Sequence, residues 1–170
     1  TNLIIDAMEV GIKFENKISN LILVNVFHHI SNPELFLRSA EQSLLKGGRI
    51  IMVEPSNNIW SRFVYTLVGH EKFDTEQIKW EFKSNDPLLD SNQALSWIIF
   101  KRDYKKFKKL FPNFSILNKK SIMPLSYLLS GGHTYNTKVG KVFIKIIRKL
   151  ERIFFDNQFG IFDLICIEKI

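Results

Sequence analysis

Two adjacent histidines, His28 and His29, lie in the stretch NVFHHISNPE (residues 25–34), next to an apolar run. An imidazole has an ordinary pKa of about 6.5, so either side chain suits a general base near neutral pH. For each histidine a structural role is as plausible as a catalytic one. We expect no metal site, because neighbouring side chains of a strand point to opposite faces and His70 and His133 offer no ligand spacing.

The elements that must position these histidines follow a strand–helix–strand pattern. Leu21–Phe27 is an almost continuous apolar run, typical of a strand covered on both faces. Asn32 suits a helix N-cap and Pro33 the first helical position, and Gly47-Gly48 is a stop signal. Arg49–Val53 is the next predicted strand. Since no hairpin turn separates the two strands, they should run parallel, with their carboxyl ends at the edge where open α/β sheets bind ligands.

The remaining segments predict one α/β domain with further strands and helices. Expected strands are Thr1–Ile5, Phe114–Lys120 and Ile161–Ile167; expected helices are Asn58–Val68, Asn92–Phe100, Arg102–Leu110 and Lys138–Phe155; Met8–Ser19 and Glu71–Asp90 read as loops.

Composition and charge indicate a globular protein without a membrane span and with one strongly basic segment. Apolar residues make up 45% of the chain, enough for a core, and the lone Cys166 excludes an internal disulfide. No apolar run reaches 18 residues and no signal peptide is visible, so we expect a protein that is cytoplasmic, either free or bound at the periphery of a membrane. Residues 100–152 hold 14 of the 24 Lys and Arg against two Asp and Glu, so an anionic partner should meet the protein there.

Several motifs occur in a fixed order over residues 3–55. They are Asp6-Ala7, Ile12-Lys13-Phe14, LILVNVFHHI and SNPELFLRSAEQSLLKGGRIIMVEP. This ordered set resembles the second half of the Rossmann-like core of class I S-adenosylmethionine-dependent methyltransferases, of the bacterial methyltransferase type 11 kind. The resemblance implies a three-layer sandwich around a mostly parallel sheet with an antiparallel last strand.

The chain departs from that family pattern in three places. Asn20 replaces the usual Asp, the loop LLKGG lacks a Pro, and no GxGxG occurs in the 170 residues. The glycine-rich loop and N-terminal strands of the family are thus missing, and the chain, which begins with Thr1, matches a carboxyl-terminal portion. We expect an unpaired edge on the Leu21–Phe27 strand and weak or no binding of S-adenosylmethionine by this chain alone.

The resemblance divides residues 1–170, a single partial domain, into a cofactor-side core (1–55), an acceptor-side insertion with helices (56–140), and a basic helix with the last strand (141–170). It also implies cofactor contacts. Asp6 and Ala7 match positions at the adenine end, although an Asp that merely ends a strand is the plainer reading. Asn25, Val26 and Phe27 match positions near the transferable methyl group, with His28 or His29 as catalytic candidates.

Acceptor contacts follow the next strand. Glu54, Asn57 and Trp60 match an acceptor pocket, or else form a strand-end turn with a buried Trp. Asn92 and Gln93 suit sugar hydroxyls because amides both donate and accept hydrogen bonds; a helix cap at Asn92 is equally plausible. The implied acceptor is an oxygen or nitrogen of a small molecule, a sugar or a lipid-linked glycan.

The basic segment Lys138–Arg152 supports a second hypothesis. Its apolar residues recur at helical spacing and its Lys and Arg surround them. Such a helix either packs its apolar face on the sheet, the reading we favour, or lies at an anionic membrane surface. A non-catalytic remnant that binds a membrane or partner through this segment is the alternative function. No nucleic acid is expected, since no stacking motif or helix-turn-helix pattern is present.

Overall fold

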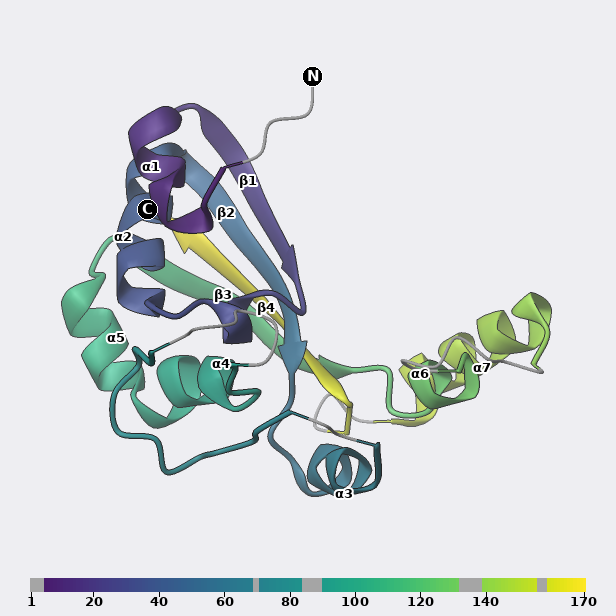
Figure 1. Cartoon of the computed structure of the whole chain (residues 1–170). Helices are drawn as coiled ribbons and strands as arrows, with labels where there is room; N and C mark the ends of the chain where they lie inside the picture. Colours follow the sequence, from purple (N-terminus) through teal and green to yellow (C-terminus); the bar gives the residue numbers. More distant parts are fainter. Residues whose placement is uncertain (1–4, 69–70, 84–89, 132–138, 156–158) are drawn as a thin grey trace.

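A computed structural model describes residues 5–68, 71–83, 90–131, 139–155 and 159–170, and these residues form an α/β fold (Figure 1). The strands are β1 (Ile18–Val24), β2 (Leu44–Pro55), β3 (Phe114–Ile122) and β4 (Phe162–Lys169). The helices are α1 (Val10–Lys13), α2 (Pro33–Ser43), α3 (Ile59–Val68), α4 (Leu95–Trp97), α5 (Tyr104–Leu110), α6 (Ser126–Leu129) and α7 (Lys141–Phe154), with the short helices η1 (Ala7–Glu9), η2 (Phe27–His29) and η3 (Ile98–Arg102). The predicted strand at Thr1–Ile5 falls almost wholly outside the described residues.

The four strands form one mixed sheet in the order β1-β2-β4-β3. β1 and β2 are parallel, as predicted, with Leu23 opposite Met52 and Val24 opposite Val53. The last strand, β4, is antiparallel to both of its neighbours, also as predicted. The prediction of a mostly parallel sheet is wrong, because β4 inserts between β2 and β3 and makes two of the three pairings antiparallel.

Helix α2 joins the parallel strands and begins as its sequence predicts. The Asn32 side chain accepts a hydrogen bond from the Leu35 N–H at 2.9 Å, and Pro33 occupies the first turn. The helix ends at Ser43, however, and β2 starts at once with Leu44. The predicted stop at Gly47-Gly48 is therefore wrong; Gly47, with φ 76°, lies in the irregular first part of β2.

The segment Met8–Ser19, predicted as loop, instead contains η1, α1 and the start of β1. Gly11 allows this compact arrangement. Its N–H donates to Ser39 Oγ at 2.6 Å, and a Cβ at this position would lie only 2.5 Å from the Ser39 carbonyl oxygen. Glycine thus lets α1 pack directly against α2.

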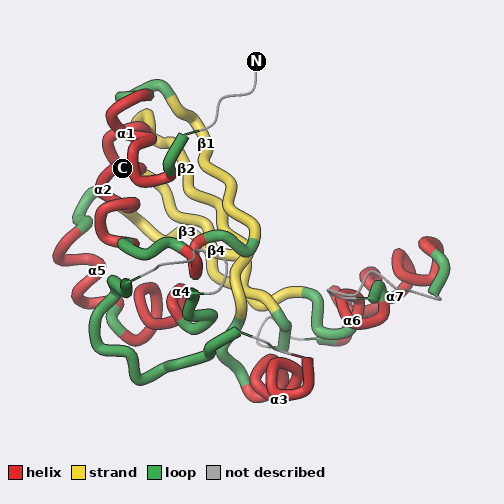
Figure 2. The backbone as a smooth tube through the Cα atoms, in the orientation of Figure 1, coloured by secondary structure: helices red, strands yellow, loops and turns green. Residues whose placement is uncertain are grey.

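The main core lies on one face of the sheet, under α2, α4, η3 and α5 (Figures 1 and 2). It contains the sheet residues Leu23, Ile50, Met52, Ile165 and Ile167 together with Leu37, Ala40, Ile98, Ile99, Phe107 and Phe111. On the opposite face Ile22 and Val24 of β1 are 70% and 57% exposed. Among the described residues, this face is covered at one end, where Val64 of α3 packs with Phe162. In the described part of the chain the predicted three-layer sandwich is therefore only partly formed.

Helices α6 and α7 project from the sheet (Figure 2). The buried Glu151 of α7 accepts hydrogen bonds from the backbone N–H groups of Leu125 and Ser126, at 2.7 and 2.6 Å. The apolar side chains of α7 remain open, with Val142 and Ile153 73% and 64% exposed. The prediction that this apolar face packs on the sheet is wrong, because the contact between α6 and α7 is made on another side of the helix.

Candidate functional site

The candidate site lies where β1 and β2 end side by side. The predicted strand Leu21–Phe27 stops at Val24, and the Asn25 N–H donates to the Val53 carbonyl at 2.8 Å. Asn25 then takes a left-handed conformation with φ 52°, which Asn adopts more readily than most residues. The chain turns sharply there, and the helix η2 follows instead of more strand.

Glu54, at the end of β2, holds this turn in place. Its buried carboxylate accepts hydrogen bonds from the N–H groups of Val26 (3.0 Å), Phe27 (2.8 Å) and His28 (3.3 Å). The second oxygen also contacts Nδ1 of His28 at 2.6 Å. Glu54, expected to line the acceptor pocket, is thus fully enclosed by the turn and acts as a positioning residue.

A second carboxylate, Glu71, meets both histidines. Its Oε2 lies 3.3 Å from Nε2 of His28 and 4.0 Å from Nε2 of His29. The two rings are 4.2 Å apart, so the prediction that they point to opposite faces is wrong: they belong to a 3-10 turn and not to a strand. The same oxygen of Glu71 accepts from Ser91 Oγ at 3.1 Å and Gln93 Nε2 at 3.4 Å.

We call His28, His29, Glu54 and Glu71 the histidine cluster. Contacts between His28 and the two carboxylates shift the pKa values of His28 and Glu71. Burial lowers the pKa of His28, but hydrogen bonds and charge attraction from Glu54 and Glu71 outweigh it and raise the pKa to about 9. The hydrogen bond from His28 lowers the pKa of Glu71 to about 2. At neutral pH His28 is therefore protonated and Glu71 ionised, and in this state His28 has no lone pair with which to accept a proton.

Asn25, Val26 and Phe27, which are expected to contact a cofactor, differ from one another in burial. Asn25 Oδ1 is buried without a hydrogen-bond partner among the described atoms, and the Val26 side chain is exposed. The Phe27 ring is fully buried, 6.0 Å from the Phe36 ring and 5.4 Å from the Phe100 ring, so only its backbone faces the turn.

Asp6 and Ala7, expected at the adenine end of the site, have local partners. The Asp6 carboxylate accepts from the Met8 N–H at 2.8 Å and caps η1, and Ala7 packs against the main core. In the described part of the chain, no hydrogen bond links either residue to the turn at Asn25–His29. Asp6 is thus the N-cap of a short helix, and the strand that the plainer reading has it end falls almost wholly outside the described residues.

Two of the expected acceptor residues serve the fold. Trp60 donates from Nε1 to the Pro124 carbonyl at 2.7 Å and packs in the smaller core near α3. The buried Asn92 amide is fully used: it accepts from the N–H groups of Asp74 and Ala94, and donates to the Asp74 carbonyl and to Gln77. Such saturation favours the structural role of Asn92. Gln93, in contrast, joins the histidine cluster through Glu71.

Asn57 lines a cleft of about 510 Å³, which we call the Asn57 cleft. Its walls are Ser56, Asn57, Asn58, Trp97, Lys101, Lys119, Lys120, Ser121 and Asp163. Lys119 Nζ is buried without a hydrogen-bond partner in the described structure, although Asp163 lies 3.5 Å away, and burial lowers the pKa of this lysine. Three lysines against one carboxylate favour an anion in this cleft.

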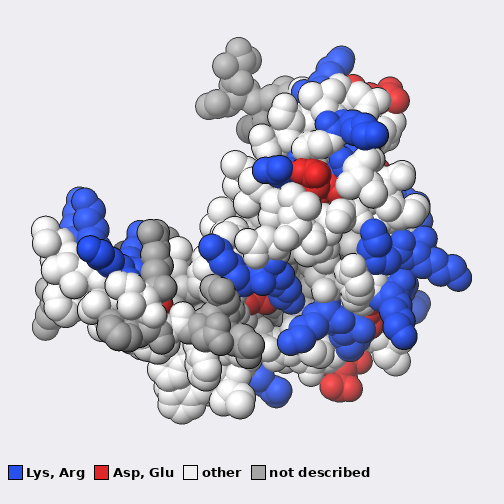
Figure 3. All heavy atoms as spheres, turned by 180° about the vertical axis from the view of Figure 1, so that it is seen from behind, with Lys and Arg blue, Asp and Glu red and all other residues white. Residues whose placement is uncertain are grey.

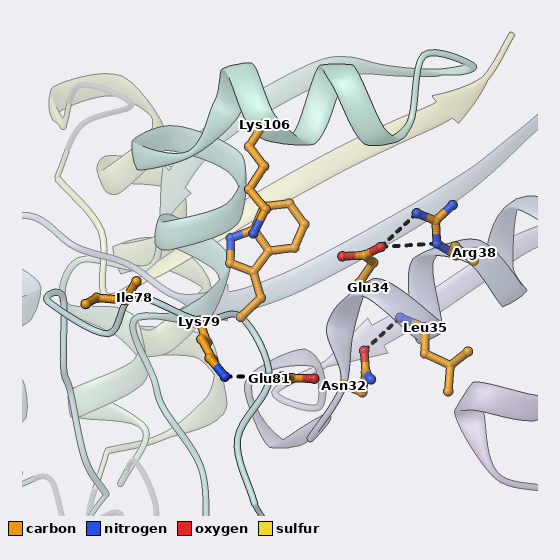
Figure 4. Close-up of a pocket in the computed structure, with 9 residues that line it drawn as sticks. Asn32, Glu34, Leu35, Arg38, Ile78, Lys79, Glu81 and Lys106 are labelled. Carbon is orange, nitrogen blue, oxygen red and sulfur yellow. Dashed lines mark hydrogen bonds and ion pairs between the residues drawn. The ribbon is translucent and has the colours of Figure 1, made fainter.

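A cleft of about 570 Å³ lies at the start of α2 (Figure 4). Its charged side chains are paired with one another: Arg38 with Glu34 at 2.7 Å, and Lys79 with Glu81 at 3.9 Å. Lys106 lies over the Trp80 ring, 4.2 Å from its centroid. Since its lining includes none of the residues at the strand ends, we do not assign the site to this cleft.

Comparisons with known proteins were made for the whole chain. No protein family and no curated protein matches the sequence. Among solved structures, the chain is similar to a SAM dependent methyltransferase from Archaeoglobus fulgidus (12% identity, TM-score 0.45) and to the MccD protein (16% identity, TM-score 0.37). These alignments cover 99% and 92% of this chain, which spans 66% and 62% of the two matched chains. Identities and TM-scores this low assign no function, so the chemistry of the site must supply it.

Proposed function

We propose that the chain forms one flank of the pocket of an S-adenosylmethionine-dependent methyltransferase. The observation that carries the proposal is Asn25, whose side-chain oxygen is buried and unpartnered among the described atoms at the tip of a parallel strand. A buried acceptor without a donor costs about 1–3 kcal/mol, so a ligand that donates a hydrogen bond there is favoured. The ordered motifs over residues 3–55 favour this cofactor class.

Asn25 and Val26 fit such a cofactor. Asn25 would accept a hydrogen bond from an amino or hydroxyl group, and Val26 would offer an exposed apolar surface. The Phe27 ring does not fit, because it is enclosed in the core. S-adenosylmethionine supplies an activated methyl group, so this chain needs to align the acceptor and take its proton.

His29 is the better placed of the two predicted catalytic histidines. It is 21% exposed, whereas His28 is buried and already protonated. The proton leaving an acceptor hydroxyl or amine would pass to His29, and the ionised Glu71 nearby would stabilise the resulting imidazolium. The new bond joins the methyl carbon to the acceptor atom, and the electrons of the broken carbon–sulfur bond stay on sulfur.

The Asn57 cleft, which follows the end of β2, is our proposed binding site for the anionic part of the acceptor. His29 does not line this cleft, so the reacting hydroxyl or amine would extend from it toward the turn at Asn25–His29. The lysines of the cleft favour an acceptor with a phosphate or carboxylate group, within the class of small molecules, sugars or lipid-linked glycans. Asn57 supplies an amide group for acceptor hydroxyls, whereas the Ser121 hydroxyl already donates to Asp163 at 2.7 Å.

A titration with S-adenosylhomocysteine, followed by amide NMR shifts, tests the cofactor proposal even where binding is weak. We expect shift changes at Asn25–His29, and we expect Asn25→Ala to weaken binding by roughly tenfold, the effect of about 1.4 kcal/mol. Asn20→Ala, an exposed position on the same strand, is the matched control. No shifts at Asn25–His29 up to saturating ligand, or equal losses in both variants, would refute the proposal.

A second candidate function is attachment to an anionic membrane through α7. It is favoured by the open apolar face, which includes Val142, Phe143, Ile146, Leu150 and Ile153, and by the exposed Lys141, Lys145, Arg148 and Lys149 beside it. Figure 3 shows a few of the Lys and Arg side chains on the projecting part of the molecule and a larger group on the main body. No helix in the described residues is long and apolar enough to cross a membrane, and an amphipathic helix needs no such length to lie at the surface.

Vesicle co-sedimentation tests the membrane proposal. We expect binding to vesicles with anionic lipid, weaker binding at high salt, and a loss of about tenfold for Ile146→Glu, because a charge then enters the buried face. Ile78→Glu, at an exposed position outside α7, should bind as the parent chain does. Equal binding of all three proteins would contradict a role for α7.

A further inference from the structure

Three side chains of the histidine cluster are of types that bind metal ions. The proposed function assigns them no role as metal ligands. The sequence led us to expect no metal site, but the 3-10 turn brings the two histidine rings together. We therefore propose that His28, His29 and Glu71 bind a divalent transition-metal ion. Their ligand atoms, two imidazole nitrogens and one carboxylate oxygen, lie within 4.8 Å of one another. Three ligands from two segments of the chain would leave positions on the ion open to a small molecule.

The distances suit a single ion. Ligands about 2.0–2.2 Å from a zinc-like ion lie roughly 3–3.5 Å apart from one another. The Glu71 oxygen is 3.3 Å from His28 Nε2 and 4.0 Å from His29 Nε2. Small side-chain rotations would therefore bring all three atoms into a first coordination sphere.

Glu54 supports this assignment, because it fixes the ring of His28 from behind. Its carboxylate contacts Nδ1 at 2.6 Å and so directs the opposite nitrogen, Nε2, toward Glu71 and His29. A carboxylate on the far nitrogen of a ligating histidine is a common support of metal sites. Glu54 is itself held by three backbone N–H groups, so the orientation of the ring is rigid.

Gln93 provides a second, independent observation. Its side chain is only 8% exposed, its Nε2 lies 3.4 Å from the Glu71 oxygen, and its Oε1 has no hydrogen-bond partner among the described atoms. An unpaired buried acceptor beside the three ligands suits a water molecule bound to an ion, because such a water donates strong hydrogen bonds.

Ligand chemistry selects the class of ion. Imidazole with carboxylate suits Zn²⁺, Co²⁺, Ni²⁺ or Fe²⁺, whereas Mg²⁺ and Ca²⁺ prefer oxygen ligands alone. A bound ion would acidify an acceptor hydroxyl and replace His29 as the means of proton removal. That role rests on the proposed function; the binding of the ion does not.

Metal titration of the untagged, chelator-treated chain tests the proposal without any cofactor. We expect one Zn²⁺ per chain by calorimetry and a Co²⁺ visible spectrum typical of nitrogen and oxygen ligands. His29→Ala and Glu71→Gln should each weaken Zn²⁺ binding by about tenfold or more. Glu76→Gln, which removes an exposed charge from the same loop, is the matched control and should leave binding unchanged.

Further measurements distinguish metal binding at this site from unfolding of the variants and from binding by other histidines. Thermal unfolding of each variant shows whether it remains folded, and the partly exposed His29 provides a variant that should not disturb the core. His70 and His133 lie outside the described residues, and the proposed site is complete without them. A double variant, His70→Ala with His133→Ala, should therefore bind as the parent chain does. Absence of Zn²⁺ binding at millimolar ion, equal losses in Glu71→Gln and Glu76→Gln, or loss in the double variant would overturn the proposal. Failure to bind S-adenosylhomocysteine would leave it standing.

Discussion

Glu54→Ala should lower the free energy of unfolding by about 3–5 kcal/mol, among the largest effects of any single substitution in this chain. The substitution leaves three backbone N–H groups without their acceptor. It also removes the buried carboxylate that balances the charge of His28. Unpaired donors and an uncompensated buried charge are both costly, and here they occur together. Urea denaturation at pH 6 measures the difference.

Two variants show whether position or charge causes this loss. Glu54→Gln retains an acceptor but not the charge, so it should cost less than Glu54→Ala. Glu168→Gln breaks the partly exposed pair with Arg49, and should cost about 1 kcal/mol or less. A loss below about 1 kcal/mol in Glu54→Ala would show that the turn at Asn25–His29 does not depend on this carboxylate.

The metal-free chain should lose stability as the pH rises from about 6.5 to 9. The pKa of His28 is raised from 6.5 to about 9 in the folded state, so the folded chain holds this proton more tightly than the unfolded chain does. The stabilisation is complete below pH 6.5 and is lost as the pH rises through 9, an effect of about 3 kcal/mol. Urea denaturation at intervals of pH, with a chelator present, measures it.

Glu71 makes the free energy of unfolding depend on pH in the opposite direction, at acidic pH. Its pKa is lowered from 4.5 to about 2, so its contribution is present above pH 4.5 and is lost as the pH falls through 2. The ion pair between His28 and Glu71 therefore contributes most from about pH 4.5 to 6.5. His28→Gln should abolish most of the fall above pH 6.5; a wild-type profile that is flat from pH 6.5 to 9 would contradict the assignment.

Local sequence signals predict the strand–helix–strand unit well, because its determinants are close together in the chain. Asn32 and Pro33 start α2 as expected, and the apolar runs become β1 and β2. The end of β1 is misplaced by three residues, since the run stays apolar through Phe27 while the chain turns at Asn25. Apolarity indicates burial but does not distinguish a strand from a buried 3-10 turn.

The histidine cluster is only half predictable. His28 and His29 stand out as a pair, but Glu71 lies in a segment that reads as loop and has no spacing signal toward them. Only the folded chain brings that segment across the ends of the strands. The sequence does not predict the open face of α7 either. An amphipathic pattern indicates that one face of the helix is apolar, but it does not show whether that face packs against protein or lies in lipid.

The position of β4 has a consequence for biosynthesis. Residues 162–169 are synthesised after the other described strands, yet they lie between β2 and β3. The pair between Arg49 and Glu168, which are 119 positions apart, forms only when this last strand is available. Until residues 162–169 leave the ribosome, β2 and β3 each present an open edge that invites wrong pairing. Such distant contacts slow folding, so the nascent chain has a long interval in which a chaperone would be of use.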